Sequence, residues 1–116
     1  MPHLQLEYTK NIQTIIHPVL FEQLFSILNT VAEISLVNCK SRSIQINDYQ
    51  IGSGNNKIGF VHLEIKILEG RKKEIRNQIG RESMEIIRSY FKKYTTKYNI
   101  CPAPTNWTSL RVSIVS

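Results

Sequence analysis

The order strand–helix–strand occurs twice along this chain of 116 residues, and this order constrains the fold more than any other feature. Alternating apolar and polar residues predict strands at 3–8 and 60–68, and a helical pattern follows each of them. A strand at 39–46 follows the first helix, and a strand at 110–114 follows the second. We therefore expect one α+β domain over residues 1–116, in which two right-handed βαβ units share a sheet.

The helices and connectors have recognisable boundaries. Pro18 suits the first position of a helix, and leucines at helical spacing extend this helix to about Ala32. A second, longer helix is predicted at 72–94, while 52–57 and 101–104 have the residues of connectors. The core face of the strand at 60–68 is predicted to consist of Val61, Leu63, Ile65 and Ile67.

The net charge and the composition limit the classes of protein to which this chain can belong. The net charge is +6, from 15 Lys and Arg against 9 Asp and Glu, which favours an anionic partner, either nucleic acid or a small polyanion. Cys39 and Cys101 are too few for a disulfide scaffold and lack metal spacing, so we expect reduced thiols in a cytoplasmic protein. No apolar stretch approaches the ~20 residues of a membrane span.

Pro2 is the first residue that could carry chemistry. Removal of the initiator methionine would expose a secondary amine, and nearby cations would lower the pKa of that amine. A base that titrates near neutral pH is what proton abstraction next to a carbonyl requires. A proline at this position also occurs by chance or for N-terminal processing, so the residue alone leaves both interpretations open.

A set of cations is the second feature. Lys40 and Arg42 share one face of a predicted strand, and Arg71 follows Gly70 at a junction between strand and helix. Arginine binds carboxylates through two parallel hydrogen bonds, and the amides of a helix start help to hold an anion. Each cation is also compatible with an ordinary solvated surface.

Signals for other classes of function are weaker. His3, His17 and His62 show no metal-ligand spacing, so no metal site is predicted. No glycine-rich phosphate loop is present. Aromatic residues at 90–94 have the spacing of a helix core, and no RNA-binding strand motif appears, so a basic RNA-binding ferredoxin-like domain is the least favoured alternative.

Several short stretches of the sequence form a recognisable ordered set. In chain order they are Met1–Tyr8, Asn11–Ile12, Cys39–Ser41, Asp48–Tyr49, Gly52–Gly54, Phe60–Leu63 and Ile67–Arg71. This ordered set resembles the 5-carboxymethyl-2-hydroxymuconate isomerases of the tautomerase superfamily. The resemblance extends roughly from Pro2 to Phe91.

The resemblance implies a tautomerase fold, with two βαβ units forming a sheet and the helices on one face. It implies a homotrimer with active sites near subunit boundaries. It also implies cofactor-free ketonisation of a small polyanionic dienol, a diacid or triacid, in aromatic catabolism such as homoprotocatechuate degradation. Neither a nucleic acid nor a membrane partner belongs to this reaction.

The resemblance also assigns roles to residues. Pro2 would be the general base that takes the hydroxyl proton or shuttles it to the adjacent carbon. Arg71 matches a family arginine that holds a substrate carboxylate or polarises the 2-oxo group. Lys40 stands where the family usually has arginine, and a lysine offers a point charge rather than a planar fork. Arg42 is expected to compensate.

Two further positions and one alternative complete the prediction. His3 and Phe60 match family positions near the pocket, and we expect them to line it without taking part in chemistry. The strand at 110–114 has no assured place in its own sheet, and a partner chain commonly closes such an edge, which also favours a homotrimer. The alternative function is a catalytically silent trimer of the same fold that acts as a binding or structural protein.

Overall fold

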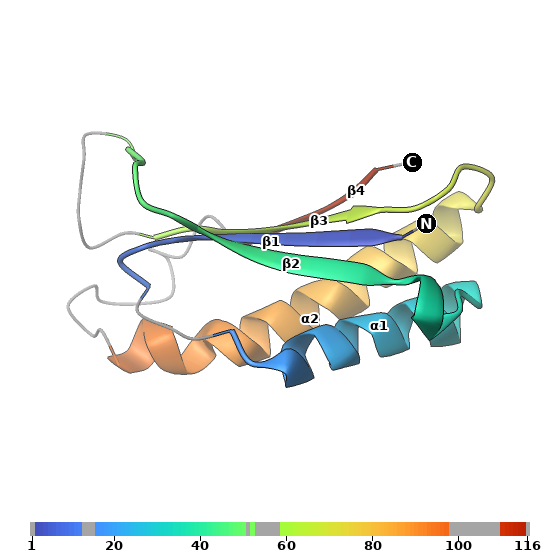
Figure 1. The fold of residues 1–116 in the computed structure, drawn as a ribbon, viewed down its shortest axis with the longest axis horizontal. Coiled ribbons are helices and arrows are strands. Elements are labelled where there is room, and N and C mark those ends of the chain that lie inside the picture. The colour runs from blue at the N-terminus through green and yellow to red at the C-terminus, as the bar shows by residue number, and fades with distance from the viewer. Residues whose placement is uncertain (1, 13–15, 51, 53–58, 98–109, 116) are drawn as a thin grey trace.

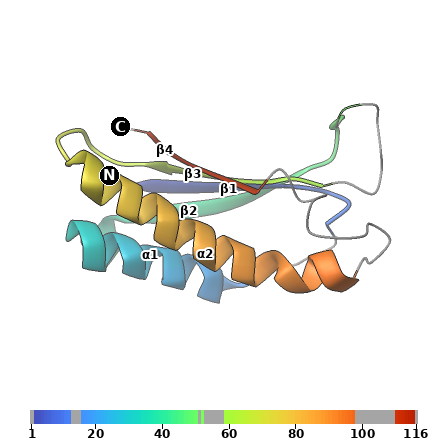
Figure 2. The ribbon, with the colours of Figure 1, turned by 180° about the vertical axis from the view of Figure 1, so that it is seen from behind.

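The computed structural model describes residues 2–12, 16–50, 52, 59–97 and 110–115 of the chain. These residues form a four-stranded sheet that is covered on one face by two long helices (Figures 1 and 2). In chain order the elements are β1 (His3–Thr9), α1 (Pro18–Ala32), the short 3₁₀ helix η1 (Leu36–Asn38), β2 (Lys40–Ile46), β3 (Val61–Lys66), α2 (Lys73–Lys97) and β4 (Leu110–Val115).

The strand order β2-β1-β3-β4 confirms the fold predicted from the sequence. β1 pairs in parallel with β2, β3 pairs in parallel with β4, and the two central strands β1 and β3 are antiparallel. Each parallel pair is connected through a helix, so the domain consists of two βαβ units joined side by side. The tautomerase-like arrangement, with both helices on one face, is therefore correct (Figure 1).

The expectation for the last strand was wrong in one respect. β4 does have a place in its own sheet, because it pairs with β3 from Val61 and Leu110 to Lys66 and Val115. The antiparallel pairing of β1 leaves the other edge of β3 open, and β4 occupies that edge. An unpaired last strand therefore gives no argument for a homotrimer.

The core lies between the sheet and the helices, and alternation along the strands supplies the side chains on the sheet side. The predicted core face of β3 is confirmed, since Val61, Leu63 and Ile65 are completely buried and Ile67 is nearly so. Such burial stabilises a domain by ~25 cal/mol for each Å² of apolar surface removed from water. The other buried side chains that pack here include Leu4, Leu6, Leu20, Leu24, Leu28, Ile79, Ile87 and Phe91.

The ends of α1 follow from local chemistry. The helix starts at Pro18 as predicted, and the ring Nδ1 of His17 accepts a hydrogen bond from the amide of Val19 (3.2 Å). It ends at Glu33, which has a left-handed backbone (φ 57°) and donates its amide hydrogen to the carbonyl of Asn29 (3.1 Å). This cap turns the chain from α1 towards η1 and β2.

Other expectations lie partly or wholly outside the described residues. The second helix extends three residues beyond the predicted end at position 94. The connector at 101–104 and most of that at 52–57 are outside the described part of the chain, as is Cys101. No helix in the described residues is long and apolar enough to cross a membrane.

Candidate active site

A cavity of about 310 Å³ opens at the end of the sheet where β1 begins. The chain start lies there beside the turn that follows α1 and the loop that connects β3 with α2 (Figure 1). The cavity is thus formed where three segments distant in sequence meet. Its lining residues are Pro2, Glu33, Ile34, Ser35, Asn38, Leu68 and Arg71.

Pro2 is buried at this end of β1. Its carbonyl oxygen accepts a hydrogen bond from the backbone amide of Lys40 (3.1 Å), which extends the parallel pairing of β1 with β2 by one residue. The pairing fixes the first residues of the strand, which would otherwise fray as chain termini commonly do. The pyrrolidine ring of Pro2 is therefore held against the cavity.

Arg71 approaches the same cavity from the loop between β3 and α2. Gly70 has a left-handed backbone (φ 106°) that favours glycine, and this conformation turns the chain just before the arginine. The Arg71 side chain is half-buried, and its Nη1 donates one long hydrogen bond to the carbonyl of Leu68 (3.4 Å). The structure thus brings together the two residues predicted to be catalytic, Pro2 and Arg71.

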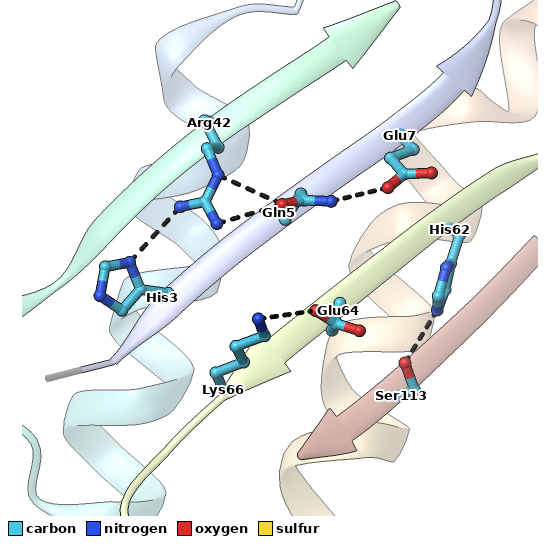
Figure 3. Close-up of polar contacts among 8 residues, drawn as sticks. All are labelled: His3, Gln5, Glu7, Arg42, His62, Glu64, Lys66 and Ser113. Atoms are coloured by element: carbon cyan, nitrogen blue, oxygen red, sulfur yellow. Dashed lines mark hydrogen bonds and ion pairs between the residues drawn. The ribbon is translucent and has the colours of Figure 1, made fainter. Parts of the chain in front are cut away.

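The other predicted cations lie on the opposite, open face of the sheet. Lys40 is in register with His3 and Arg42 with Gln5, so these side chains project away from the helices. Arg42 donates from Nε and Nη2 to Oε1 of Gln5 (3.3 and 3.1 Å), and its Nη1 lies 3.4 Å from Nδ1 of His3 (Figure 3). Neither Lys40 nor Arg42 is among the described lining residues of the cavity.

His3 also belongs to the open face rather than to the cavity lining. Its partial burial, and then the nearby charges of Arg42 and Lys40, lower the pKa of the imidazole below its ordinary value of 6.5. Both effects lower the pKa because they disfavour the protonated imidazole. These effects favour the neutral form of His3, which is at the same end of the sheet as Pro2 but on the open face.

Phe60 is at the far end of the sheet from Pro2. It precedes β3, and its amide donates to Oγ1 of Thr9, the last residue of β1 (3.1 Å). Its ring packs edge-to-face on Tyr49, with centroids 6.4 Å apart. The intervening strand separates Phe60 from Pro2 by ~20 Å, at a rise of ~3.3 Å per residue. Within one chain, Phe60 does not line the cavity.

Sequence reasoning did not find Glu33, Ser35 or Asn38, which also line the cavity. The signal for Glu33 was the end of the first helix near Ala32, since the residue after a helix commonly turns the chain and points away from it. Nothing in the local sequence indicated that this turn would meet the loop of Arg71. That meeting depends on the pairing of β1 with both β2 and β3.

Other titratable groups of the described residues do not gather into a metal site. In the described ranges, no three His, Cys, Asp or Glu side chains lie close enough to bind a metal ion. The thiol of Cys39 is partly buried, and this burial raises its pKa above the ordinary value. A raised pKa reduces the thiolate fraction on which cysteine reactivity depends.

The fold defines the chain as a tautomerase-fold protein. A crystal structure of a 5-carboxymethyl-2-hydroxymuconate isomerase from Deinococcus radiodurans R1 has a TM-score of 0.76 and 24% identity, covering 99% of this chain and 83% of that chain. A fused 4-OT wild-type symmetric trimer has a TM-score of 0.68 and 11% identity, covering 97% of this chain and 82% of that chain. At these identities the likeness concerns the fold alone.

Sequence comparison identifies the family within this fold. The family model of 5-carboxymethyl-2-hydroxymuconate isomerase matches residues 2–102. A 5-carboxymethyl-2-hydroxymuconate Delta-isomerase from Escherichia coli is 30% identical over 92 residues, which are 78% of this chain and 73% of the relative. The chain therefore belongs to the 5-carboxymethyl-2-hydroxymuconate isomerase family, and it is an isomerase.

Proposed function

We propose that the chain ketonises a dienol polyacid of the 2-hydroxymuconate type, without a cofactor, and that Pro2 is the general base. The observation that carries this proposal is the cavity that both Pro2 and Arg71 line. Pro2 precedes β1 and Arg71 follows β3, and the antiparallel pairing of these strands places both residues at the same end of the sheet. The family relationship supports the same class of reaction. The reaction belongs to small-molecule metabolism in the cytoplasm, with no nucleic acid or membrane partner.

The proposed reaction moves one proton and creates no redox change. The neutral amine of Pro2 takes the proton of the 2-hydroxyl group, and the oxygen electron pair forms the carbonyl. The π electrons of the diene shift towards the distal carbon, so that this carbon, rather than the carbon adjacent to the new carbonyl, receives the proton back from the protonated amine. Pro2 therefore ends the cycle as it began, and a general base of this kind contributes about 10²–10⁴-fold to a rate.

Arg71 is proposed to hold the substrate carboxylate or the developing oxygen charge. Its guanidinium makes a single long hydrogen bond to Leu68 within the described residues, which leaves further N–H groups for a ligand. Lys40, on the open face at the same end of the sheet, would add positive potential. Arg42 is held by Gln5 and His3, so a compensating role for it requires that these contacts break.

We also propose that the chain works as a homotrimer. The similar solved structures include fused 4-OT trimers of the same fold. Phe60 is a strand's length away from the cavity of its own chain, so its proposed lining role requires a neighbouring subunit. Sedimentation equilibrium should give the trimer mass at micromolar concentration, and a monomer under those conditions would contradict the proposal.

Pro2 can be tested by blocking its amine. A chain that begins at Pro2, as intact mass should show, is expected to ketonise 2-hydroxymuconate with an ascending limb in the pH profile of kcat/KM. A variant that retains one residue before Pro2 converts the amine into an amide, which cannot take the proton. Wild-type turnover by this blocked and folded variant would show that Pro2 is not the base.

Arg71 can be tested with its neighbour as a control. Arg71→Ala should lower kcat/KM by about 10²–10³-fold, as is typical when a donor to developing charge is removed. The thermal midpoint should hardly change, because substitution of a surface arginine usually alters stability by within ~0.5 kcal/mol. Lys72→Ala removes an exposed charge one residue further and should retain activity. Equal activities of the two variants would refute the role of Arg71.

The alternative is a catalytically silent trimer that binds a ligand or serves a structural role. The observation in its favour is that Arg71 shares the cavity lining with an acidic residue, Glu33, while Lys40 is on the other face of the sheet. Absence of turnover of both 2-hydroxymuconate and phenylenolpyruvate by the chain beginning at Pro2 would favour this alternative. If Lys40→Arg then turned over either substrate, the lack of activity in the wild type would be attributed to the lysine at position 40.

A further inference from the structure

Glu33 is an exposed acidic residue that lines the cavity together with Pro2 and Arg71. We propose that Glu33 determines specificity: its carboxylate disfavours substrates according to the number of carboxylates they carry, so that the chain prefers a diacid 2-hydroxydienoate to a triacid. This inference rests on the proposed function and narrows its substrate class. It distinguishes 2-hydroxymuconate from its 5-carboxymethyl derivative, which has one more carboxylate.

The first observation in support of this role is the charge of the residues that line the cavity. Among the described residues that line it, Arg71 is positive, Glu33 is negative, and the other side chains are uncharged. Arg71 can match one substrate carboxylate. Any further carboxylate that enters meets Glu33 without a second lining cation from the same chain. A cavity of about 310 Å³ is ~7 Å across, which does not exceed the Debye length of ~8 Å in physiological salt, so this repulsion is only partly screened.

The second step is that the backbone of Glu33 is held in place. Its amide donates to the carbonyl of Asn29 (3.1 Å), and the amide of Ile34 donates to the carbonyl of Leu28 (3.2 Å). The side chain of Asn29 in turn donates to the carbonyl of Ile34 (3.0 Å). Ile34 is also buried in the core. The segment that carries the carboxylate therefore cannot swing away from the cavity without breaking the cap of α1.

The third step is that local structure does not favour a glutamate here. The φ of 57° lies in the left-handed region, where helices commonly end with glycine. A negative charge at a helix C-terminus also opposes the helix dipole. In the described part of the chain, no ion pair joins Glu33 to Arg71 that would offset these effects. Local stability therefore does not account for a glutamate at this position.

The test uses three substrates that share a 2-hydroxydienoate unit. 2-Hydroxyhexa-2,4-dienoate, 2-hydroxymuconate and 5-carboxymethyl-2-hydroxymuconate carry one, two and three carboxylates. The wild type should prefer the diacid to the triacid in kcat/KM. Glu33→Gln keeps the length of the side chain and removes its charge. It should leave the monoacid unchanged, raise the diacid about threefold and raise the triacid about tenfold, where tenfold corresponds to ~1.4 kcal/mol.

A matched control separates this local effect from the change in net charge. Glu22 is exposed on α1 and is not among the residues that line the cavity. Glu22→Gln changes the net charge by the same amount and should leave the ratios among the three substrates unchanged. Glu22→Gln should keep the thermal midpoint of the wild type, because it alters no buried side chain. Glu33→Gln should not lower the midpoint, because it removes a negative charge from the C-terminus of α1.

The outcomes distinguish this inference from the proposed function. Equal effects of Glu33→Gln on all three substrates, or a loss with the triacid alone, would overturn the role of Glu33. If the wild type turns over none of the three substrates, the proposed function fails. The role of Glu33 is then tested by the affinity for unreactive ligands. Calorimetry would then compare muconate with hexa-2,4-dienoate, which share six carbons and differ by one carboxylate. Tighter binding of muconate alone to Glu33→Gln would support the inference, and an unchanged ratio would overturn it.

Discussion

Gly59 offers a sharp test of the packing at the end of the sheet opposite the cavity. It is buried just before Phe60 and β3. A Cβ added at Gly59 would lie 2.7 Å from Oγ1 of Thr9, 2.9 Å from Cγ1 of Ile12 and 3.0 Å from Oδ1 of Asn11. Contacts below 3.0 Å require that a neighbour moves, so Gly59→Ala should destabilise the domain.

The hydrogen bonds of Thr9 set the magnitude. Thr9 is completely buried, and its hydroxyl donates to Oδ1 of Asn11 (2.6 Å) and accepts from the amide of Phe60 (3.1 Å). Overpacking of a core typically costs ~1–3 kcal/mol, and a disturbed hydrogen bond adds ~0.5–1.5 kcal/mol. We therefore expect a loss of about 2–4 kcal/mol, a large part of the ~5–15 kcal/mol by which a domain is stable.

The assay is urea unfolding at one fixed protein concentration, because association would shift the midpoint. Gly80→Ala is the matched control, since Gly80 is inside α2 and a Cβ there would meet no heavy atom within 4 Å. It should stabilise the protein by ~0.8–1.0 kcal/mol through helix propensity. If Gly59→Ala is as stable as the wild type, the close approach of Gly59 to Thr9 is refuted.

Two further predictions concern polar side chains. His3 should titrate below 6.5 by NMR, and Arg42→Gln should raise its pKa, because Arg42 is among the causes that oppose its protonation. Since the unfolded state then takes up this proton first, stability should fall as pH drops through the interval just below 6.5, and His3→Gln should remove that dependence. Ser83→Ala should raise the thermal midpoint, because the buried Ser83 hydroxyl has no hydrogen-bond partner in the described residues and alanine favours the helix; a fall would show that the hydroxyl is satisfied.

Local sequence determined the elements and their buried faces. Strand alternation has a period of two, so the burial of Val61, Leu63 and Ile65 could be read directly from their spacing. Pro18 fixed the start of α1, because proline suits only the first turn of a helix. The resemblance to a family added Pro2 and Arg71 as a pair, which no periodicity would have linked.

The tertiary structure decided which of the predicted site residues meet. Lys40 and Pro2 are neighbours across β1 and β2, yet the pleat directs the side chain of Lys40 to the open face and away from the cavity. The same pairing gave Arg42 the partners Gln5 and His3. Strand alternation gives two faces, but only the register between strands determines which residues share a face at one end of the sheet.

The cavity itself could not be predicted from the sequence. Its lining comes from the start of β1, the turn after α1 and the loop before α2, whose meeting depends on the order in which four strands pair. Local preferences act over a few residues, whereas these pairings join distant parts of the chain through burial of a common core. The sequence therefore determined that Pro2 and Arg71 were present and chemically suitable, while the packed sheet and helices decided that they share a cavity with Glu33.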